Sequence, residues 1–190
     1  MKRISRVVLM FLFMVGMLGV ATISESADYV GVKKCKACHI KQYKSWATTT
    51  MATSFENLKP GVKAAEKKKA GLDGDKDYTA DADCLRCHTT GYGKPSGFTS
   101  IAETPDLANV QCEGCHGAGG DFKTVMKNKM FKLDEAIEAG LKLPNEKNNN
   151  CMDCHGSDSP FNEKVDPKYK FDIKDRLAKT HEHFPLKYEH

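Results

Sequence analysis

Two cysteines and a histidine recur four times in the chain with the same internal spacing. The segments are CKACH at 35–39, CLRCH at 84–88, CEGCH at 112–116 and CMDCH at 151–155. Together they use all eight cysteines, and a histidine directly follows each second cysteine. Two thiols three residues apart can each form a thioether to one vinyl group of a haem while the adjacent imidazole reaches the iron. The spacing therefore predicts four covalently attached c-type haems.

The predicted attachment residues are the two cysteines of each motif, and the predicted proximal iron ligands are the four histidines. In chain order they are Cys35, Cys38 and His39; Cys84, Cys87 and His88; Cys112, Cys115 and His116; and Cys151, Cys154 and His155. The predicted cofactors are four haem c groups, each with one iron.

Three other uses of paired cysteines explain less of the pattern. A zinc site built from CxxC pairs needs four ligands and gives no role to a histidine after every pair. A disulfide framework suits an exported protein but also leaves the histidines unused. A thioredoxin-like redox motif needs only one pair, in a βαβ setting. Zinc and disulfides are thus the alternatives to haem.

The first 26 residues have the layout of a secretory signal peptide. Three basic residues precede a mostly apolar run over 7–20, and small polar residues follow at Ser24 and Ser26. An uncleaved membrane anchor is the alternative, but the run is shorter than the roughly 20 apolar residues of a spanning helix. We predict a signal peptide over 1–26, one tetrahaem domain over 27–190 and a periplasmic location, with the outer surface as the alternative.

The 164 residues after the predicted cleavage site are poor in large apolar side chains. Leu, Ile, Val and Phe supply only 26 of them, a fraction typical of chains that do not build their own core. Buried haem faces would add the missing apolar surface, so we expect a largely unfolded apoprotein. Removing 1–26 reduces the 29 basic and 25 acidic residues to 26 and 24, and this near balance gives no indication of nucleic-acid binding.

Apolar periodicity and helix start and stop signals predict short helices. They span 33–45, 52–59, 62–70, 133–139 and 172–180. The segment 91–105 is expected to be a loop, 145–150 a polar connector, and the lysines at 67–69 a solvated face. Strand signals are nearly absent. The predicted fold class is mainly α with long loops: a compact, haem-stacked multihaem cytochrome c with little or no β-sheet.

The residues around the motifs resemble a known family. GVKKCKACHIKQYKSW, TGYGKPSGF, NVQCEGCHGAGG and CMDCHGSDSPF, with a histidine near the end of the chain, are similar to the tetrahaem cytochrome c-554 family over nearly the whole mature chain. The resemblance implies an exported, mostly helical, haem-stacked electron carrier. The best-known member takes electrons from hydroxylamine oxidoreductase, and relatives serve other anaerobic respiratory chains.

Two positions depart from the pattern of that family. Relatives commonly have a distal ligand histidine twelve residues after the histidine of the first motif, where this chain has Met51. They often have another six residues after the histidine of the third motif, where this chain has Phe122. Phenylalanine cannot ligate iron, so Phe122 is expected to pack against a haem face. Met51 can ligate, because His/Met coordination occurs in cytochromes c, or it can serve as a packing residue.

Three histidines lie outside the motifs, all within the last ten residues: His181, His183 and His190. His181 best matches the C-terminal ligand that the resemblance implies. His183 shares a face with His181 only if the segment is extended, and His190 ends the chain, where disorder is common. The candidate distal iron ligands are therefore these three histidines and Met51. We expect at least one iron to be open or weakly capped unless all four ligate.

The sequence predicts an electron carrier without catalytic side chains, which works by outer-sphere transfer between a redox-protein donor and a redox-protein acceptor. Nucleic acid is not an expected partner, and a membrane is expected only through those partners. One alternative is a reductase that acts on nitric oxide, hydroxylamine or nitrite at an open haem. Another is a subunit of an extracellular filament that self-associates through exposed haem edges.

Overall fold

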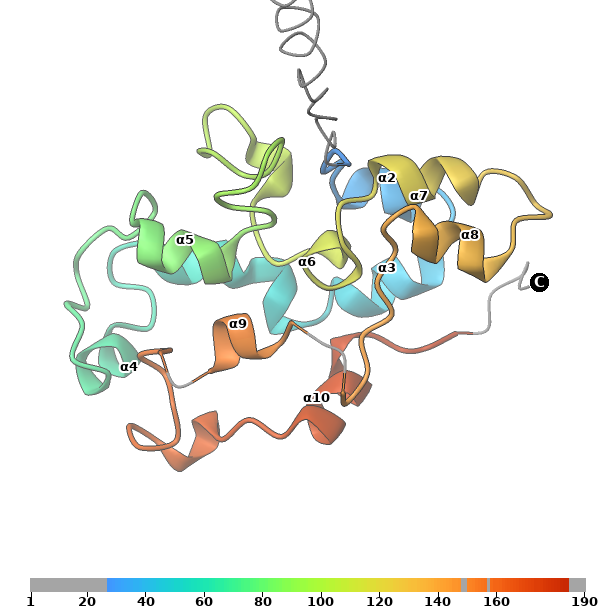
Figure 1. The fold of residues 1–190 in the computed structure, drawn as a ribbon. Coiled ribbons are helices and arrows are strands. Elements are labelled where there is room, and N and C mark those ends of the chain that lie inside the picture. The colour runs from blue at the N-terminus through green and yellow to red at the C-terminus, as the bar shows by residue number, and fades with distance from the viewer. Residues whose placement is uncertain (1–26, 148–149, 157, 185–190) are drawn as a thin grey trace, which may run out of the picture.

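The computed structural model describes residues 27–147, 150–156 and 158–184 as short helices joined by long loops (Figure 1). The α-helices are α2 (Val32–Lys36), α3 (Ile40–Trp46), α4 (Ala64–Lys69), α5 (Ala82–His88), α6 (Cys112–His116), α7 (Gly120–Val125), α8 (Leu133–Glu138), α9 (Met152–His155) and α10 (Ile173–Thr180). The 3-10 helices are η1 (Thr50–Leu58), η2 (Pro105–Leu107) and η3 (Pro167–Tyr169).

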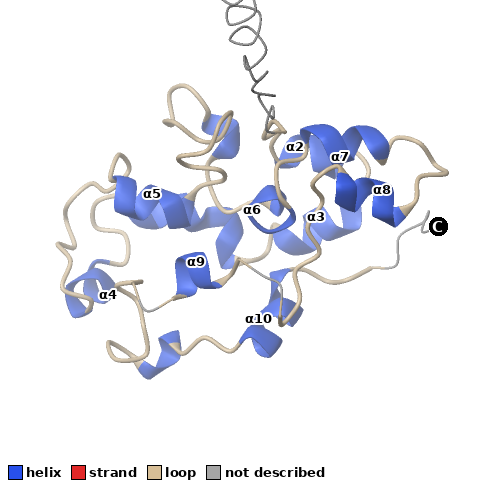
Figure 2. Cartoon of the chain, viewed as in Figure 1, coloured by secondary structure: helices blue, strands red, loops and turns tan. Residues whose placement is uncertain are grey.

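β-Structure within the described ranges is limited to one isolated antiparallel bridge between Thr89 and Ala108. Figure 2 accordingly draws helices and loops without a strand over these ranges. The predicted fold class, mainly α with long loops, is confirmed.

The helices that carry the motifs run through the middle of the molecule. In Figure 1, α6 and α9 lie between α5 on one side and α2 and α3 on the other. Helix α2 contacts α6, and α5 contacts α9. These contacts bring together motifs that are far apart in the sequence.

A hydrophobic cluster beside η1 and α5 forms the larger part of the polypeptide core. Its buried members are Phe55, Leu58, Tyr78, Leu85, Phe98, Leu107 and Ala108. Phe98 is only 1% exposed, and its ring centroid lies 5.7 Å from that of Phe55. The N–H of Phe98 donates to the carbonyl of Thr90 at 3.0 Å. The loop after the second motif is thereby anchored next to the helix that carries that motif.

A smaller cluster joins α7 and α8, which contact each other. Its buried members are Phe122, Phe131, Ala136 and Leu141. Phe122 therefore packs against protein side chains, in place of the haem face expected from the sequence. The chain builds two small cores of its own, which its low content of apolar residues did not predict.

The helices predicted at 133–139 and 172–180 are confirmed by α8 and α10, and α4 forms within the predicted 62–70. The helix predicted over 33–45 is broken after α2, because His39 leaves the helical region with φ −106° and ψ 51°. The segment predicted at 52–59 is the 3-10 helix η1, which is kinked at Thr53. The sequence did not indicate α5, α6, α7 or α9, and three of these carry motifs.

Lys67 does not lie on the solvated face expected of the lysines at 67–69. It is only 4% exposed, and its ammonium group donates to the carbonyl of Lys59 at 2.8 Å. The same group lies 5.3 Å from the ring centroid of Tyr78. Lys68 and Lys69 are exposed, as predicted.

The predicted signal peptide over 1–26 lies outside the described residues, so its cleavage stays a prediction. None of the described helices is both long and apolar enough to cross a membrane.

Candidate haem-binding sites

The backbone of each motif forms one helical turn. Helices α5, α6 and α9 carry the second, third and fourth motifs. In the first motif, the N–H of His39 donates to the carbonyl of Cys35 at 2.9 Å, just beyond α2. Residues three and four apart lie on the same face of such a turn. Each turn therefore presents two thiols and an imidazole on one side, as attachment to a single haem requires.

The imidazoles of His88 and His116 are oriented by backbone carbonyls. Nδ1 of His88 lies 2.6 Å from the carbonyl oxygen of Ser54, and Nδ1 of His116 lies 2.9 Å from that of Lys142. An Nδ1–H that donates to a carbonyl leaves Nε2 unprotonated and able to bind a metal. These two side chains have the arrangement expected of proximal haem ligands.

Burial favours the neutral form of all four motif histidines. Desolvation lowers the pKa of His39, His88, His116 and His155 below the ordinary value of 6.5. A metal binds the neutral imidazole, so the lowered pKa maintains the ligating form at neutral pH. Paired thiols beside a neutral imidazole fit haem c. The described residues include no cluster of three or more His, Cys, Asp or Glu side chains placed to hold a bare metal ion.

The first and third motifs are in direct contact. Interaction between the thiols of Cys35 and Cys112 raises the pKa of Cys35 and lowers that of Cys112. The helices that carry these two thiols, α2 and α6, also touch each other. Haems attached at these motifs would therefore be neighbours.

Glu113, inside the third motif, holds the first motif in place. It is only 2% exposed, and its carboxylate accepts hydrogen bonds from three backbone N–H groups. These belong to Val30 at 2.9 Å, Gly31 at 2.8 Å and Gly119 at 2.7 Å. Gly31 has φ 76° and a Cβ there would lie 3.3 Å from the carbonyl oxygen of Asp106, so glycine permits this approach. The carboxylate thus satisfies donors on both sides of the contact between the motifs.

Gln111 makes a second set of hydrogen bonds between the first and third motifs. Its Oε1 accepts from the N–H of Val32 at 2.7 Å, and its Nε2 donates to the carbonyls of Asp106 and Ala108, both at 2.7 Å. The side chain is 5% exposed and ties the start of α2 to η2 and α6. Sequence reasoning missed both Gln111 and Glu113, for which the only signal was their position in or beside a motif.

The third motif also lies next to the fourth, and the fourth lies next to the second. The amide of Asn150 donates to a backbone carbonyl of the third motif, and electrostatic interaction links Cys115 with Cys151. Helix α9 contacts α5, and interaction between the thiols of Cys154 and Cys87 lowers the pKa of Cys87 to about 7. The four motifs therefore form one series in space, in the order first, third, fourth, second.

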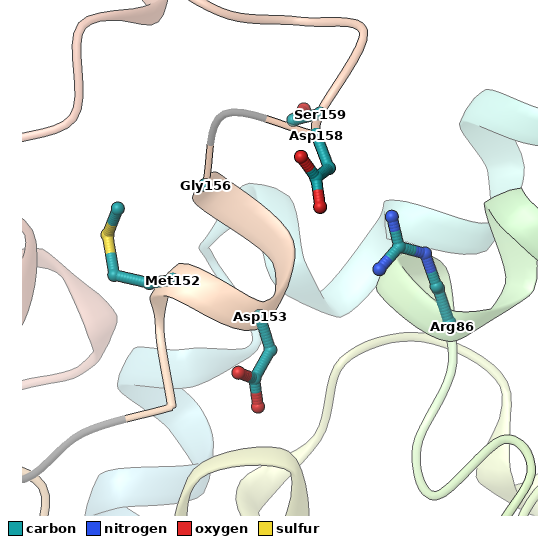
Figure 3. Close-up of a pocket in the computed structure, with 6 residues that line it drawn as sticks. All are labelled: Arg86, Met152, Asp153, Gly156, Asp158 and Ser159. Carbon is teal, nitrogen blue, oxygen red and sulfur yellow. The ribbon is translucent and has the colours of Figure 1, made fainter.

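A polar pocket of about 520 Å³ opens between the second and fourth motifs (Figure 3). It is lined by Arg86, Met152, Asp153, Gly156, Asp158 and Ser159. Arg86 from α5 and Asp158 from the loop after α9 face each other across it, whereas Met152 points away. Arg86 supplies a positive charge between the second and fourth motifs. This pocket was not predicted from the sequence.

Met51 lies beside the third motif. Its backbone carbonyl accepts a hydrogen bond from the N–H of Val110 at 3.3 Å, two residues before Cys112. Ser54, from the same 3-10 helix, accepts from the same N–H at 3.0 Å through its hydroxyl. The start of η1 is thus held against the approach to α6, and the half-buried Met51 is held with it.

His181 lies next to the histidines of the first and third motifs. Its ring centroid is 6.3 Å from that of His116, and its charge contributes, after desolvation, to the lowered pKa of His39. Two imidazoles that bind one metal from opposite sides, with metal–nitrogen distances of about 2 Å, have ring centroids roughly 6 Å apart. Nδ1 of His181 lies 2.9 Å from the carbonyl oxygen of Glu182, which leaves Nε2 for a metal.

The two other C-terminal candidates differ from His181. The ring of His183 lies 4.7 Å from that of His181, but its Nε2 is 3.4 Å from the carbonyl oxygen of Leu177. His190 lies outside the described residues. The described distal candidates Met51, His181 and His183 therefore gather around the first and third motifs. At the fourth motif, the ring of Phe171 stacks on that of His155, with 4.5 Å between centroids.

A helical chain that brings four such attachment sites into one contacting series is a multihaem c-type cytochrome. A family described as "Cytochrome c554 and c-prime" matches residues 34–117. Cytochrome c-554 of Nitrosomonas europaea is 36% identical over 191 residues, which cover 87% of this chain and 80% of that protein. The solved structure of the reduced state of cytochrome c554 from the same organism matches with a TM-score of 0.78 and 34% identity, over 86% of this chain and 89% of that one.

This chain therefore belongs to the cytochrome c-554 family, as its motifs indicated. It is a multihaem electron-transfer protein, and its cofactors are four haem c groups with their irons. The expected class of protein and the expected cofactors are confirmed.

Proposed function

We propose that this protein is a periplasmic carrier that relays electrons between a redox-protein donor and a redox-protein acceptor, and that it is not an enzyme. The observation that carries the proposal is the series of motif contacts: α2 with α6, Asn150 with Gly114 of the third motif, and α9 with α5. A carrier needs its redox centres close enough for electrons to enter at one and leave at another. The predicted signal peptide over 1–26 supports the periplasmic location.

The residues proposed to hold the haems are the eight motif cysteines, as thioether partners, and the four motif histidines, as proximal ligands. When bound, the haems supply the redox-active irons. The carbonyls of Ser54 and Lys142 orient His88 and His116 through Nδ1. Glu113 and Gln111 hold the first motif against the third and so set the separation of two redox centres.

Two distal ligands are proposed at the first and third motifs. His181 would supply a distal imidazole to an iron in this pair, because the separation of its ring from that of His116 is about that of two imidazoles on one metal. Met51 is proposed for the third motif, since its backbone is held beside Val110. His183 and His190 are secondary candidates.

The carrier proposal is tested by comparing two rates in the same preparation. The fully reduced protein is mixed in a stopped-flow instrument with an oxidised small redox protein, and separately with nitrite or hydroxylamine. We expect rapid oxidation of all four haems by the redox protein and far slower consumption of either small molecule. Rapid multiple turnover of nitrite or hydroxylamine, abolished by carbon monoxide, would favour the reductase. The polar pocket lined by Arg86, Asp153 and Asp158 is the place where such chemistry would find charged groups.

Ligation by Met51 is tested by spectroscopy. If its sulfur binds iron, the oxidised protein should show the weak band of His/Met coordination near roughly 700 nm. Met51→His should abolish this band and lower one midpoint potential, because imidazole favours ferric iron more than a thioether does. Met130→Leu is the control, since Met130 is 70% exposed and away from the motifs. Absence of the band in the parent protein, together with unchanged potentials in Met51→Leu, would make Met51 a packing residue.

A further inference from the structure

The chain segment that contains the first motif carries charged residues of one sign only. Between Tyr29 and Phe55 the chain has five lysines and no Asp or Glu. These lysines, named here the lysine patch, are Lys33, Lys34, Lys36, Lys41 and Lys44. Without them, the rest of 27–190 has 21 basic and 24 acidic residues. The excess positive charge of the mature chain is therefore concentrated on α2 and α3.

All five side chains of the lysine patch are exposed. Within the described residues only Lys33 forms an ion pair, with Asp106 at 2.6 Å, and both partners are well exposed. Lys36 lies over the ring of Tyr43, and Lys41 over that of Phe184, contacts that keep the positive charge. Exposed ion pairs and ring contacts of this kind are weak. The patch is thus available to an external anionic surface.

Exposed apolar groups lie among these lysines. Cys38 is exposed, whereas the other seven motif cysteines are partly covered. Ala37 and Ile40 beside it are also exposed, Ile40 by 50%. Cys38, which would hold one thioether of the haem, therefore lies at the surface. An accessible apolar centre with charges around it has the layout of a protein interface, in which charge steers the encounter.

The first motif also stands at one end of the motif series. It contacts the third motif through α2 and α6, and the series then continues to the fourth and second motifs. The other motifs have acidic side chains within or directly before them, at Asp83, Glu113 and Asp153. A partner attracted by positive charge would therefore bind at the first motif, at this end of the motif series.

We propose that the lysine patch is the docking surface for an acidic redox protein, which exchanges electrons with the haem at the first motif. This proposal rests on the carrier function proposed above. An electron leaves the reduced cofactor of the partner and converts one ferric haem to ferrous, and no bond forms or breaks. Complementary charge raises association rates by about 10- to 1000-fold at low salt. An acidic protein is the occupant because all five lysines of the patch are exposed and, among the described residues, only Lys33 has an ion-pair partner.

The test uses the holoprotein and an acidic flavodoxin as the probe. Lys34→Glu with Lys44→Glu reverses two charges that make no ion pair or ring contact within the described residues. Lys164→Glu with Lys170→Glu makes the same change of charge on exposed lysines between α9 and α10. Binding is measured by calorimetry with both proteins oxidised, so that no electron moves. Electron exchange is then measured by stopped flow with reduced flavodoxin.

The patch variant is expected to bind flavodoxin at least about tenfold more weakly, and to exchange electrons correspondingly more slowly, at about 20 mM salt. The control variant should differ from the parent by less than about threefold, and all differences should disappear near about 500 mM salt because the charges are screened. Retention of four haems and an unchanged visible spectrum would show that the fold is intact.

Equal binding by the patch and control variants would overturn the proposal while leaving the carrier function intact, provided that the parent protein exchanges electrons rapidly. A parent protein that exchanges electrons with no redox protein would instead refute the carrier function. Loss of binding to vesicles of anionic phospholipid in the patch variant, without any effect on flavodoxin, would assign the patch to a membrane surface and also overturn the proposal.

Discussion

Replacing Glu113 by alanine is expected to destabilise the folded protein by about 4 kcal/mol, among the largest effects of a single substitution. The change removes a carboxylate that is only 2% exposed and leaves the N–H groups of Val30, Gly31 and Gly119 without their acceptor. Each hydrogen bond to a charged group contributes about 1.5–3 kcal/mol. The measurement is the midpoint of guanidinium unfolding, followed by far-ultraviolet circular dichroism and by haem absorbance.

Two variants separate this effect from general destabilisation. Glu113→Gln keeps an acceptor oxygen in the same place and should lose an intermediate amount of stability. Glu103→Ala removes an exposed carboxylate and should change stability by less than about 0.5 kcal/mol. Because Glu113 positions the first motif against the third, Glu113→Ala should also alter the magnetic coupling between their haems in the EPR spectrum. Equal unfolding midpoints for Glu113→Ala and Glu103→Ala would contradict the role of Glu113 in holding the first motif against the third.

The sequence predicted the haem chemistry well because that chemistry is local. Two thiols and an imidazole must lie within one turn to reach one haem. The spacing of CEGCH at 112–116 is therefore enough to predict that its three side chains lie together. Helices with strong end signals were predicted for the same reason, as at Asp172, whose side chain caps α10 by accepting from the N–H groups of Lys174 and Asp175. The turn that each motif itself forms was not counted as a helix, because so short a segment shows no periodicity.

The spatial order of the motifs was not predictable, because it depends on contacts between distant residues. Gly31 meets Glu113 and Val32 meets Gln111 across separations of 82 and 79 residues. Neither polar side chain differs in type from the many exposed polar residues of the chain. Likewise Phe122 was assigned to a haem face because the sequence could not show that Phe131 and Leu141 would cover it. Local pattern determines the chemistry of each motif, whereas long-range hydrogen bonds determine which motifs are neighbours.

The distal ligands were predictable from the sequence only in part. The shortage of histidines could be counted from the sequence, but the place of His181 required the structure. Met51, His181 and His183 come near the first and third motifs from opposite parts of the chain. An iron without a strong distal ligand is therefore expected at the second or fourth motif, next to the pocket that Arg86 and Asp158 line.

Replacing His181 by alanine is expected to open one further iron to carbon monoxide. The reduced parent protein should bind carbon monoxide at one haem, or two at most, because few distal ligands are available. Without the His181 imidazole, an iron of the first and third motifs becomes five-coordinate, so the variant should bind one more equivalent. The midpoint potential of that haem should also rise, since imidazole stabilises ferric iron. Optical titration with carbon monoxide and a spectroelectrochemical titration measure both changes.

His183→Ala is the matched control for His181, two residues away. Its ring has the same chemistry, but Nε2 lies 3.4 Å from the carbonyl oxygen of Leu177, so its removal should leave the carbon monoxide stoichiometry unchanged. An extra equivalent in His183→Ala and none in His181→Ala would exchange the roles of the two residues. Unchanged stoichiometry and potentials in both variants would mean that neither imidazole binds iron. The 6.3 Å between the rings of His181 and His116 favours an extra equivalent in His181→Ala alone, since two imidazoles that share one metal have their centroids at about that separation.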